Sequence, residues 1–224
     1  MYFDPLGNFA ISTFLIMVGV GLLAGGTIGG ISAGINGTNV LEGIGKGMLA
    51  GGLLAASIGL TVAGISFGIG TIGGSMMFSY GLSVTANMLE VAVTQGKKSH
   101  YDGDNFGAGM NDVVNAMFAN SGRIAAGNLS ILGLNIVGTR IFSKIPSFYN
   151  IGQIAYYSQY FKDLRTMHGG SFLQAFGIST LSYLKNPAGP FKWLGYGLAG
   201  LQVYNFGRSI FSTPDFNNSK WILF

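Results

Sequence analysis

The scarcity of charge in the first ninety residues constrains this chain more than any other feature. No Lys, Arg, Asp or Glu occurs from Leu6 to Leu41, and none occurs from Gly47 to Leu89. Only Glu42 and Lys46 are charged between these two stretches. A helix that crosses a bilayer needs about 20 mainly apolar residues, so the first stretch is long enough for one such helix and the second for two. These segments are therefore expected to prefer hydrocarbon, or enclosure within a protein, to water.

Composition excludes several classes of protein. The 224 residues are 49% hydrophobic and only 9% charged, whereas soluble domains carry about 25% charged residues. The 38 glycines follow no three-residue period, and large apolar residues are too abundant for a disordered chain. The absence of cysteine excludes disulfides, zinc–thiolate sites and cysteine nucleophiles. We expect no metal site and no cofactor.

Charge changes sign along the chain, which predicts two regions. Residues 1–95 have a net charge of −2, and residues 96–224 have a net charge of +6. The boundary is expected near Gln95, at the start of the polar stretch 95–105. No basic cluster exceeds the pair Lys97 and Lys98, and binding to phosphates needs several cations on one face. We therefore expect no nucleic-acid partner, and attraction to anionic lipid is the better use of these dispersed cations.

The first region predicts a mainly α fold. Asn36 to Asn39 has the residue types of a turn, and Gly73, Gly74 and Ser75 predict a second break. Helices are expected over residues 10–34, 41–70 and 75–95. A strand is the alternative over Ile58–Phe67, where β-branched residues are frequent.

The second region predicts shorter, amphipathic helices rich in aromatic residues. Apolar residues recur at helical spacing in four segments, which run from Phe106 to Met117, from Ile154 to Leu164, from Phe172 to Leu184 and from Trp193 to Phe211. Such helices can pack on one another as an ordinary core. They can also lie at a membrane interface, where Trp, Tyr, Lys and Arg are favoured. The sequence leaves these two interpretations nearly equal.

Glycines in the first region recur every four residues, which places each series close to one helix face. One series comprises Gly21, Gly25 and Gly29, a second comprises Gly26, Gly30 and Gly34, and Gly47 and Gly51 repeat the spacing. Small residues at this spacing allow two helices in lipid to pack backbone to backbone. In an isolated helix in water each glycine would cost about 0.8–1 kcal/mol relative to alanine. We therefore predict tightly associated helices, with a buried glycine-rich hairpin in a soluble core as the alternative.

The opening residues carry a resemblance to a known family. Tyr2, Asp4, Pro5 and Gly7 resemble the phrase Tyr-x-Asp-Pro-x-Gly that closes the conserved core of Rhs (YD-repeat) proteins. The resemblance implies that residues 1–8 end an Rhs-like core and that the rest is the variable tail of a polymorphic toxin. It also implies a shell in the parent protein that encloses the tail, a cleavage site at Asp4 and Pro5, and an immunity protein as partner. Because toxic activities of such tails differ widely, the resemblance implies no particular one.

Catalytic candidates are few. His100, Asp102 and Asp104 form the one polar cluster with acid–base groups, and a solvated loop is the simpler interpretation. The other histidine, His168, lies one turn after Arg165, where capping of a helix C-terminus is its simpler role. Gly-x-Ser-x-Gly strings surround Ser32 and Ser66. We expect neither to be a hydrolase nucleophile, because that motif needs a strand before the serine and a helix after it.

Taken together, the residues favour a non-enzymatic, membrane-inserting tail. Residues 9–95 would supply helices that associate in the lipid bilayer, and residues 96–224 would lie at its interface. The consequence would be pore formation or translocation of cargo, in the membrane of a target cell or after enclosure in a secreted parent protein. One alternative is an enzymatic toxin domain in residues 96–224, with residues 9–95 as a delivery segment. Another is an integral membrane protein without toxic action.

Overall fold

The fold is a bundle of long helices, seen here in a computed structural model that describes residues 8–142, 184–185, 188 and 192–212. The helices are α1 (Asn8–Ile35), α2 (Val40–Phe67), α3 (Ile72–Tyr101), α4 (Phe106–Phe142) and α7 (Lys192–Phe211). The described residues contain no strand, which confirms the mainly α fold and settles Ile58–Phe67 as helix. The expected helices at 154–164 and 172–184 lie outside the described residues, except for Leu184.

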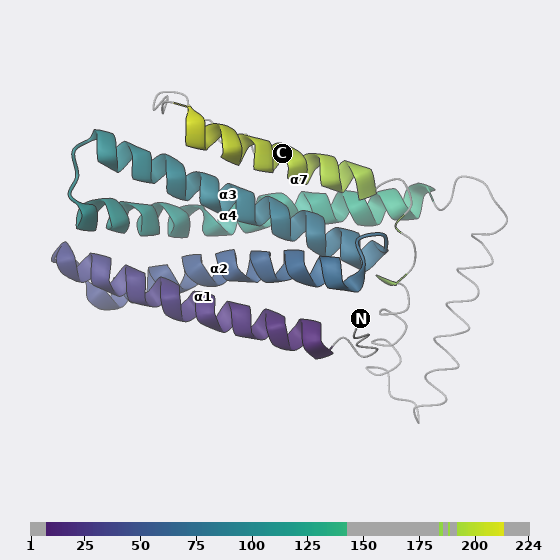
Figure 1. The fold of residues 1–224 in the computed structure, drawn as a ribbon, viewed down its shortest axis with the longest axis horizontal. Helices are drawn as coiled ribbons and strands as arrows, with labels where there is room; N and C mark the ends of the chain where they lie inside the picture. Colours follow the sequence, from purple (N-terminus) through teal and green to yellow (C-terminus); the bar gives the residue numbers. More distant parts are fainter. Residues whose placement is uncertain (1–7, 143–183, 186–187, 189–191, 213–224) are drawn as a thin grey trace.

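Short turns connect α1 to α4, so that each of these helices runs antiparallel to the one before it (Figure 1). Asn39 caps α2 by accepting hydrogen bonds through Oδ1 from the backbone N–H groups of Leu41 (3.0 Å) and Glu42 (3.3 Å). Gly37 has φ +65°, a left-handed conformation that suits glycine. The turn expected at residues 36–39 is therefore present.

The break between α2 and α3 lies earlier than expected. Gly68, with φ +102°, ends α2, and the Thr71 hydroxyl accepts the N–H of Gly74 at 3.0 Å as the N-cap of α3. The predicted break at Gly73 and Gly74 is wrong, because these glycines lie buried in the first turn of α3. Their lack of side chains serves close packing rather than a turn.

The polar stretch after residue 95 is helical over most of its length. Helix α3 continues through Gln95 to Tyr101, and the turn to α4 comprises only residues 102–105, with Gly103 at φ +79°. Lys98 and His100 lie in the last turn of α3, where cations complement the helix dipole. Helix α4 then extends over 37 residues, well past the segment whose spacing predicted it.

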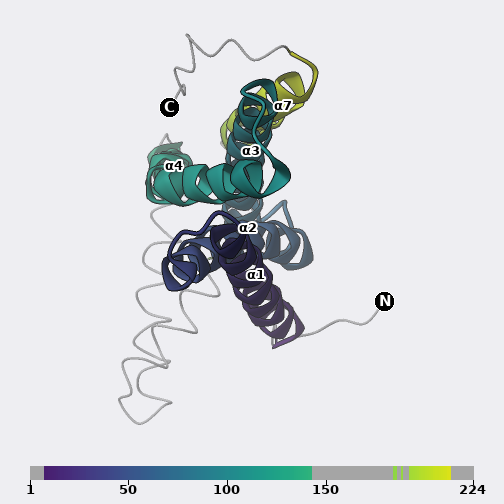
Figure 2. The same ribbon diagram turned by 90° about the vertical axis from the view of Figure 1, so that its left-hand side faces the viewer.

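Helix α3 is the centre of the bundle. It packs against α2, α4 and α7, and α7 contacts α3 and α4 but neither α1 nor α2 among the described residues. Figure 2 shows the α1–α2 pair and α7 at opposite sides, with α3 and α4 between them. A hydrophobic cluster at this centre comprises Ala50, Val84, Met88, Val91 and Ile124.

Candidate membrane-inserting hairpin

Helices α1 and α2 form an antiparallel hairpin that is packed glycine to glycine. A Cβ atom built on Gly25 or Gly29 of α1 would lie under 3.0 Å from the carbonyl oxygen of Gly47 or Gly43 of α2, respectively. The same holds for Gly21, whose Cβ would collide with the carbonyl of Gly51 and with Ala55. Real Cβ atoms essentially never approach so closely. Only glycine therefore allows the two backbones to lie at this separation.

The second series of glycines has a different role. Cβ atoms built on Gly26 and Gly30 would lie 2.7 Å from side-chain carbons of Met48 and Ile44, and one on Gly34 would lie 3.7 Å from Val40. This series therefore meets side chains of α2 rather than its backbone. The two series share the spacing of four, but only the first fixes the distance between the helices.

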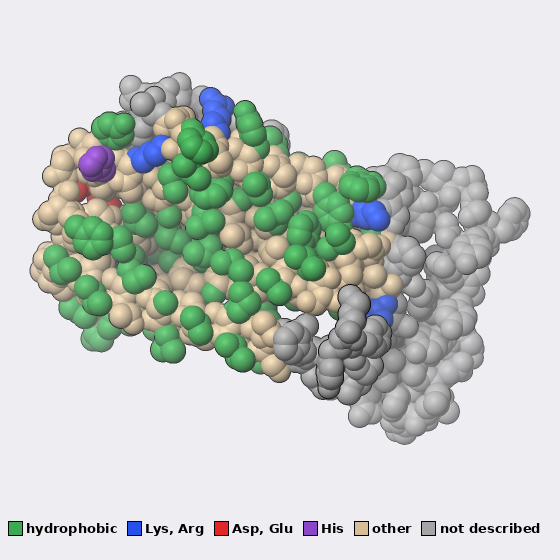
Figure 3. All heavy atoms as spheres, in the orientation of Figure 1, with side chains coloured by type: hydrophobic (Ala, Val, Ile, Leu, Met, Phe, Trp, Pro, Cys, Tyr) green, Lys and Arg blue, Asp and Glu red, His purple; other side chains and the backbone are tan. Residues whose placement is uncertain are grey.

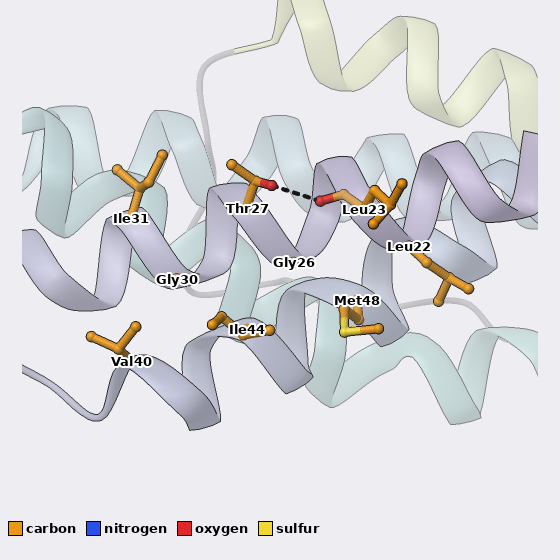
Figure 4. A pocket seen from close by; sticks show the side chains of 9 residues that line it. All are labelled: Leu22, Leu23, Gly26, Thr27, Gly30, Ile31, Val40, Ile44 and Met48. Carbon is orange, nitrogen blue, oxygen red and sulfur yellow. Dashed lines mark hydrogen bonds between the residues drawn. The ribbon is translucent and has the colours of Figure 1, made fainter.

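Beside the second series, an open groove of about 460 Å³ runs between α1 and α2 (Figure 4). Its lining is almost wholly apolar, and Thr27 turns its hydroxyl to the carbonyl oxygen of Leu23 at 2.9 Å. The lining residues are Leu22, Leu23, Gly26, Thr27, Gly30, Ile31, Val40, Ile44 and Met48.

The outer face of the hairpin is exposed and apolar. Among side chains whose burial the structure describes, seven large hydrophobic ones of each helix are exposed, including Leu23 at 73% and Leu41 at 79%. Figure 3 shows hydrophobic side chains spread over the surface that these helices form. Ser12–Ile35 and Val40–Phe67 are long and apolar enough to cross a membrane, and the bundle buries only 17% and 33% of their most apolar windows. The core helix of a soluble protein would be mostly buried, so these two helices lack the burial of a soluble core.

Buried positions are small and often polar instead. Among the residues whose burial the structure describes, the largest fully buried side chains are Met88 and Val84, followed by Ser57, Ser79, Ser83 and Ser99. In water-soluble proteins, isoleucine, leucine and phenylalanine are most often inside and serine mostly outside. Small and hydroxyl residues between helices are typical of packing in lipid. In the described bundle, small and hydroxyl residues thus occupy many of the buried positions, beside a few larger aliphatic residues such as Val91 and Ile124.

A second close interface, between α2 and α3, was not expected from the sequence. Cβ atoms built on Gly64 and Gly74 would each lie under 3.0 Å from backbone atoms of the facing helix or its end, and one on Gly81 would lie 2.5 Å from the carbonyl oxygen of Ser57. The hydroxyls of Ser57 and Thr85 lie 2.8 Å apart. The spacing of seven from Gly74 to Gly81 is the signal that could have identified this face.

The charged residues of the described hairpin, and two of its polar contacts with α4, lie toward its loop end. Lys46 Nζ lies 2.7 Å from Glu42 Oε1 and donates to Asn115 Oδ1 of α4 at 3.0 Å. Asn36 Nδ2 donates to the carbonyl oxygen of Gly107 at 2.7 Å. The only two charged residues of the described hairpin are thus paired with each other, and two polar contacts attach its loop end to α4.

Three of the candidate catalytic residues lie in the described part of the chain, at the end of α3 that leads into α4. His100, Asp102 and Asp104 are exposed around the end of α3, and the described residues contain no group of three His, Cys, Asp or Glu that could hold a metal ion. Ser32 is buried inside α1 and donates to the carbonyl oxygen of Gly29 at 3.1 Å, so it has no strand before it. His168, Asp4 and Pro5 lie outside the described residues.

Comparison with known proteins gives no relative. No protein-family model, no curated protein and no solved structure matches the chain.

Proposed function

We propose that the α1–α2 hairpin inserts into a lipid bilayer, and that this insertion is the function of the chain. One observation carries the proposal. The hairpin has glycines at its helix–helix contact and large aliphatic residues on its exposed face, whereas a soluble protein places its large aliphatic residues inside. Transfer of an exposed Leu or Ile from water to hydrocarbon gains about 1.5–3 kcal/mol. Fourteen partly exposed side chains therefore supply a driving force on the order of 10 kcal/mol.

The hairpin also meets the other requirement of a bilayer, which is that no backbone group is left without a partner in hydrocarbon. Both spans are continuous helices of 24 and 28 residues, so their backbone hydrogen bonds are internal. The charged pair of Glu42 and Lys46 lies near the turn, where it would reach the interface. Helix α3 carries Glu90, Lys97 and Lys98 and is not included in the proposed spans.

The proposed biological setting is the variable tail of an Rhs-type polymorphic toxin. The supporting residues are Tyr2, Asp4, Pro5 and Gly7, which resemble the closing phrase of the Rhs core, followed by the apolar hairpin. A shell in the parent protein would shield the exposed hairpin from water until delivery. The hairpin would then permeabilise a target membrane or carry attached cargo through it. A repeat-rich coding sequence continuous with residue 1, and a gene for an immunity protein beside it, would support this setting, and their absence would contradict it.

Vesicle experiments test insertion directly. We compare the unmodified chain with Leu23→Lys, which adds a charge to the outer face of α1. A lysine near the middle of a bilayer costs about 2.5–3.5 kcal/mol, so insertion should fall by about 100-fold. Leu129→Lys is the matched control, because Leu129 is an exposed leucine of α4 outside the hairpin. Dye release that is lost only in Leu23→Lys supports permeabilisation, and insertion without release supports translocation. Absence of partition into lipid by the unmodified chain would contradict both.

A further inference from the structure

Helix α7 packs on the bundle through its small and polar side. Its buried residues are Gly195, Ala199 and Gln202, which are spaced by four and three and therefore share one face. Ala199 is fully buried, and Gln202 is 7% exposed. Helix α3, on which α7 packs, also buries small polar residues, among them Ser79 and Ser83. A helix at the surface of a soluble protein normally turns its apolar face inward, whereas the buried positions of α7 are small or polar. Among the described residues, the aromatic contact with α3 is made by Tyr196, which is partly buried and packs edge-on against Phe78 at 5.6 Å between ring centroids.

The side of α7 that faces away from the bundle is apolar and aromatic. Trp193 is 67% exposed and Phe211 is 88% exposed, at the two ends of the helix. Between them, the exposed large side chains are Leu194, Leu201, Val203, Tyr204 and Ile210. This face belongs to a different surface from the hairpin, because α7 lies on the opposite side of the bundle (Figure 2).

Cations accompany this apolar face at both ends. Lys192 is the first residue of α7, and its Nζ lies 5.6 Å from the centroid of the Trp193 ring. Arg208 lies in the last turn. Lys97 of α3 holds that end in place by donating from Nζ to the carbonyl oxygens of Ser209, Ile210 and Ser212 at 2.7, 2.7 and 2.8 Å. The described part of α7 contains no acidic residue.

We infer that α7 is a docking surface for anionic lipid. It would bind the membrane interface before the hairpin inserts. Trp and Tyr favour the headgroup region, and a helix with an apolar face and flanking cations lies in the plane of the interface. Each Lys or Arg near an anionic surface contributes about 1 kcal/mol. Because α7 and the hairpin lie on opposite sides, one flat interface cannot contact both, so docking and insertion are separate steps. Docking by α7 is independent of the proposed function, and only the second step, insertion of the hairpin, rests on it.

The test uses the full chain with Trp221→Phe, so that Trp193 is the only tryptophan. Its fluorescence is followed as phosphatidylcholine vesicles are added, with and without phosphatidylserine. We expect a blue shift with the anionic vesicles and a much weaker one with the zwitterionic vesicles. Arg208→Gln should weaken binding about fivefold, from about 1 kcal/mol per cation. Arg123→Gln removes the same charge from an exposed position on α4 and should leave binding unchanged.

A hairpin variant separates this inference from the proposed function. In the Leu23→Lys background, Trp193 should still respond to anionic vesicles although dye release is lost. Loss of both signals in Leu23→Lys would overturn independent docking by α7. Equal binding to both kinds of vesicle, or equal losses in Arg208→Gln and Arg123→Gln, would overturn recognition of anionic lipid. A Trp193 that is already shielded in a vesicle-free dimer would assign the face to a second copy of the chain instead. If the unmodified chain docks but never inserts, the proposed function fails and the inference stands.

Discussion

Gly25 of α1 and Gly47 of α2 face each other so closely that neither position has room for a Cβ atom. A Cβ built on either residue would lie under 3.0 Å from the carbonyl oxygen of the other. The obstructing atoms belong to the backbone of a helix, which cannot turn aside as a flexible side chain can. The distance between the two helices of the hairpin is therefore set by the absence of two side chains.

Gly25→Ala should destabilise the hairpin. Overpacking typically costs about 1–3 kcal/mol, and the strain here falls on the backbone. Gly19→Ala is the matched control on the same helix, because a Cβ at Gly19 has no atom within 4 Å. It should stabilise α1 by up to about 1 kcal/mol through helix propensity. The free energy of unfolding in mild detergent measures both changes, and equal effects of the two substitutions would contradict the packing.

Helix α7 should loosen at its C-terminal end in Lys97→Met. The substitution removes the donor to three carbonyl groups while keeping most of the apolar stem. Hydrogen bonds from a charged donor contribute about 1.5–3 kcal/mol, so amides in the last turn of α7 should exchange hydrogen at least 10-fold faster. Lys98→Met is the control, since Lys98 is adjacent and exposed. Unchanged exchange in Lys97→Met, or the same increase in both variants, would contradict the stabilisation of the end of α7 by Lys97.

Stability should depend on pH through Glu90. Burial raises the pKa of the Glu90 carboxyl above its usual value of 4.5. The folded state then disfavours the ionised form, so the contribution of Glu90 to stability is fully present below about pH 4.5 and is lost as the pH rises through the folded-state pKa. Glu90→Gln should remove this loss and be the more stable protein at neutral pH. Thermal unfolding of both proteins as a function of pH checks this, and a variant that is less stable at neutral pH would contradict it.

The sequence predicted the hairpin well because its signals are local. Charge-free length, the turn at Asn36 to Asn39 and glycines every four residues each depend on neighbours in the chain. The spacing did not predict that Gly25 lies against the backbone of α2 while Gly26 lies against the side chain of Met48. That distinction depends on the rotation of α1 against α2, which only the packed pair determines.

Other features depended on contacts between distant segments. Gly74 looked like a turn residue and proved to be a packing position against Gly64 and Gly68, because glycine serves both purposes. The aromatic pattern of α7 was compatible with an inward or an outward face. Its orientation follows from the small residues Gly195 and Ala199, which lie buried on the bundle.

Insertion of the hairpin is tested most directly by a single fluorescent label at position 23. The chain has no cysteine, so Leu23→Cys gives one site for an environment-sensitive dye on the outer face of α1, and Asp104→Cys gives a control at the exposed turn after α3. On addition of vesicles, the label at position 23 should shift to the blue and become quenched by lipids that carry a quencher deep in the acyl chains. The label at position 104 should remain aqueous. A label at position 23 that stays accessible to an aqueous quencher, in protein that has bound the vesicles, would contradict insertion.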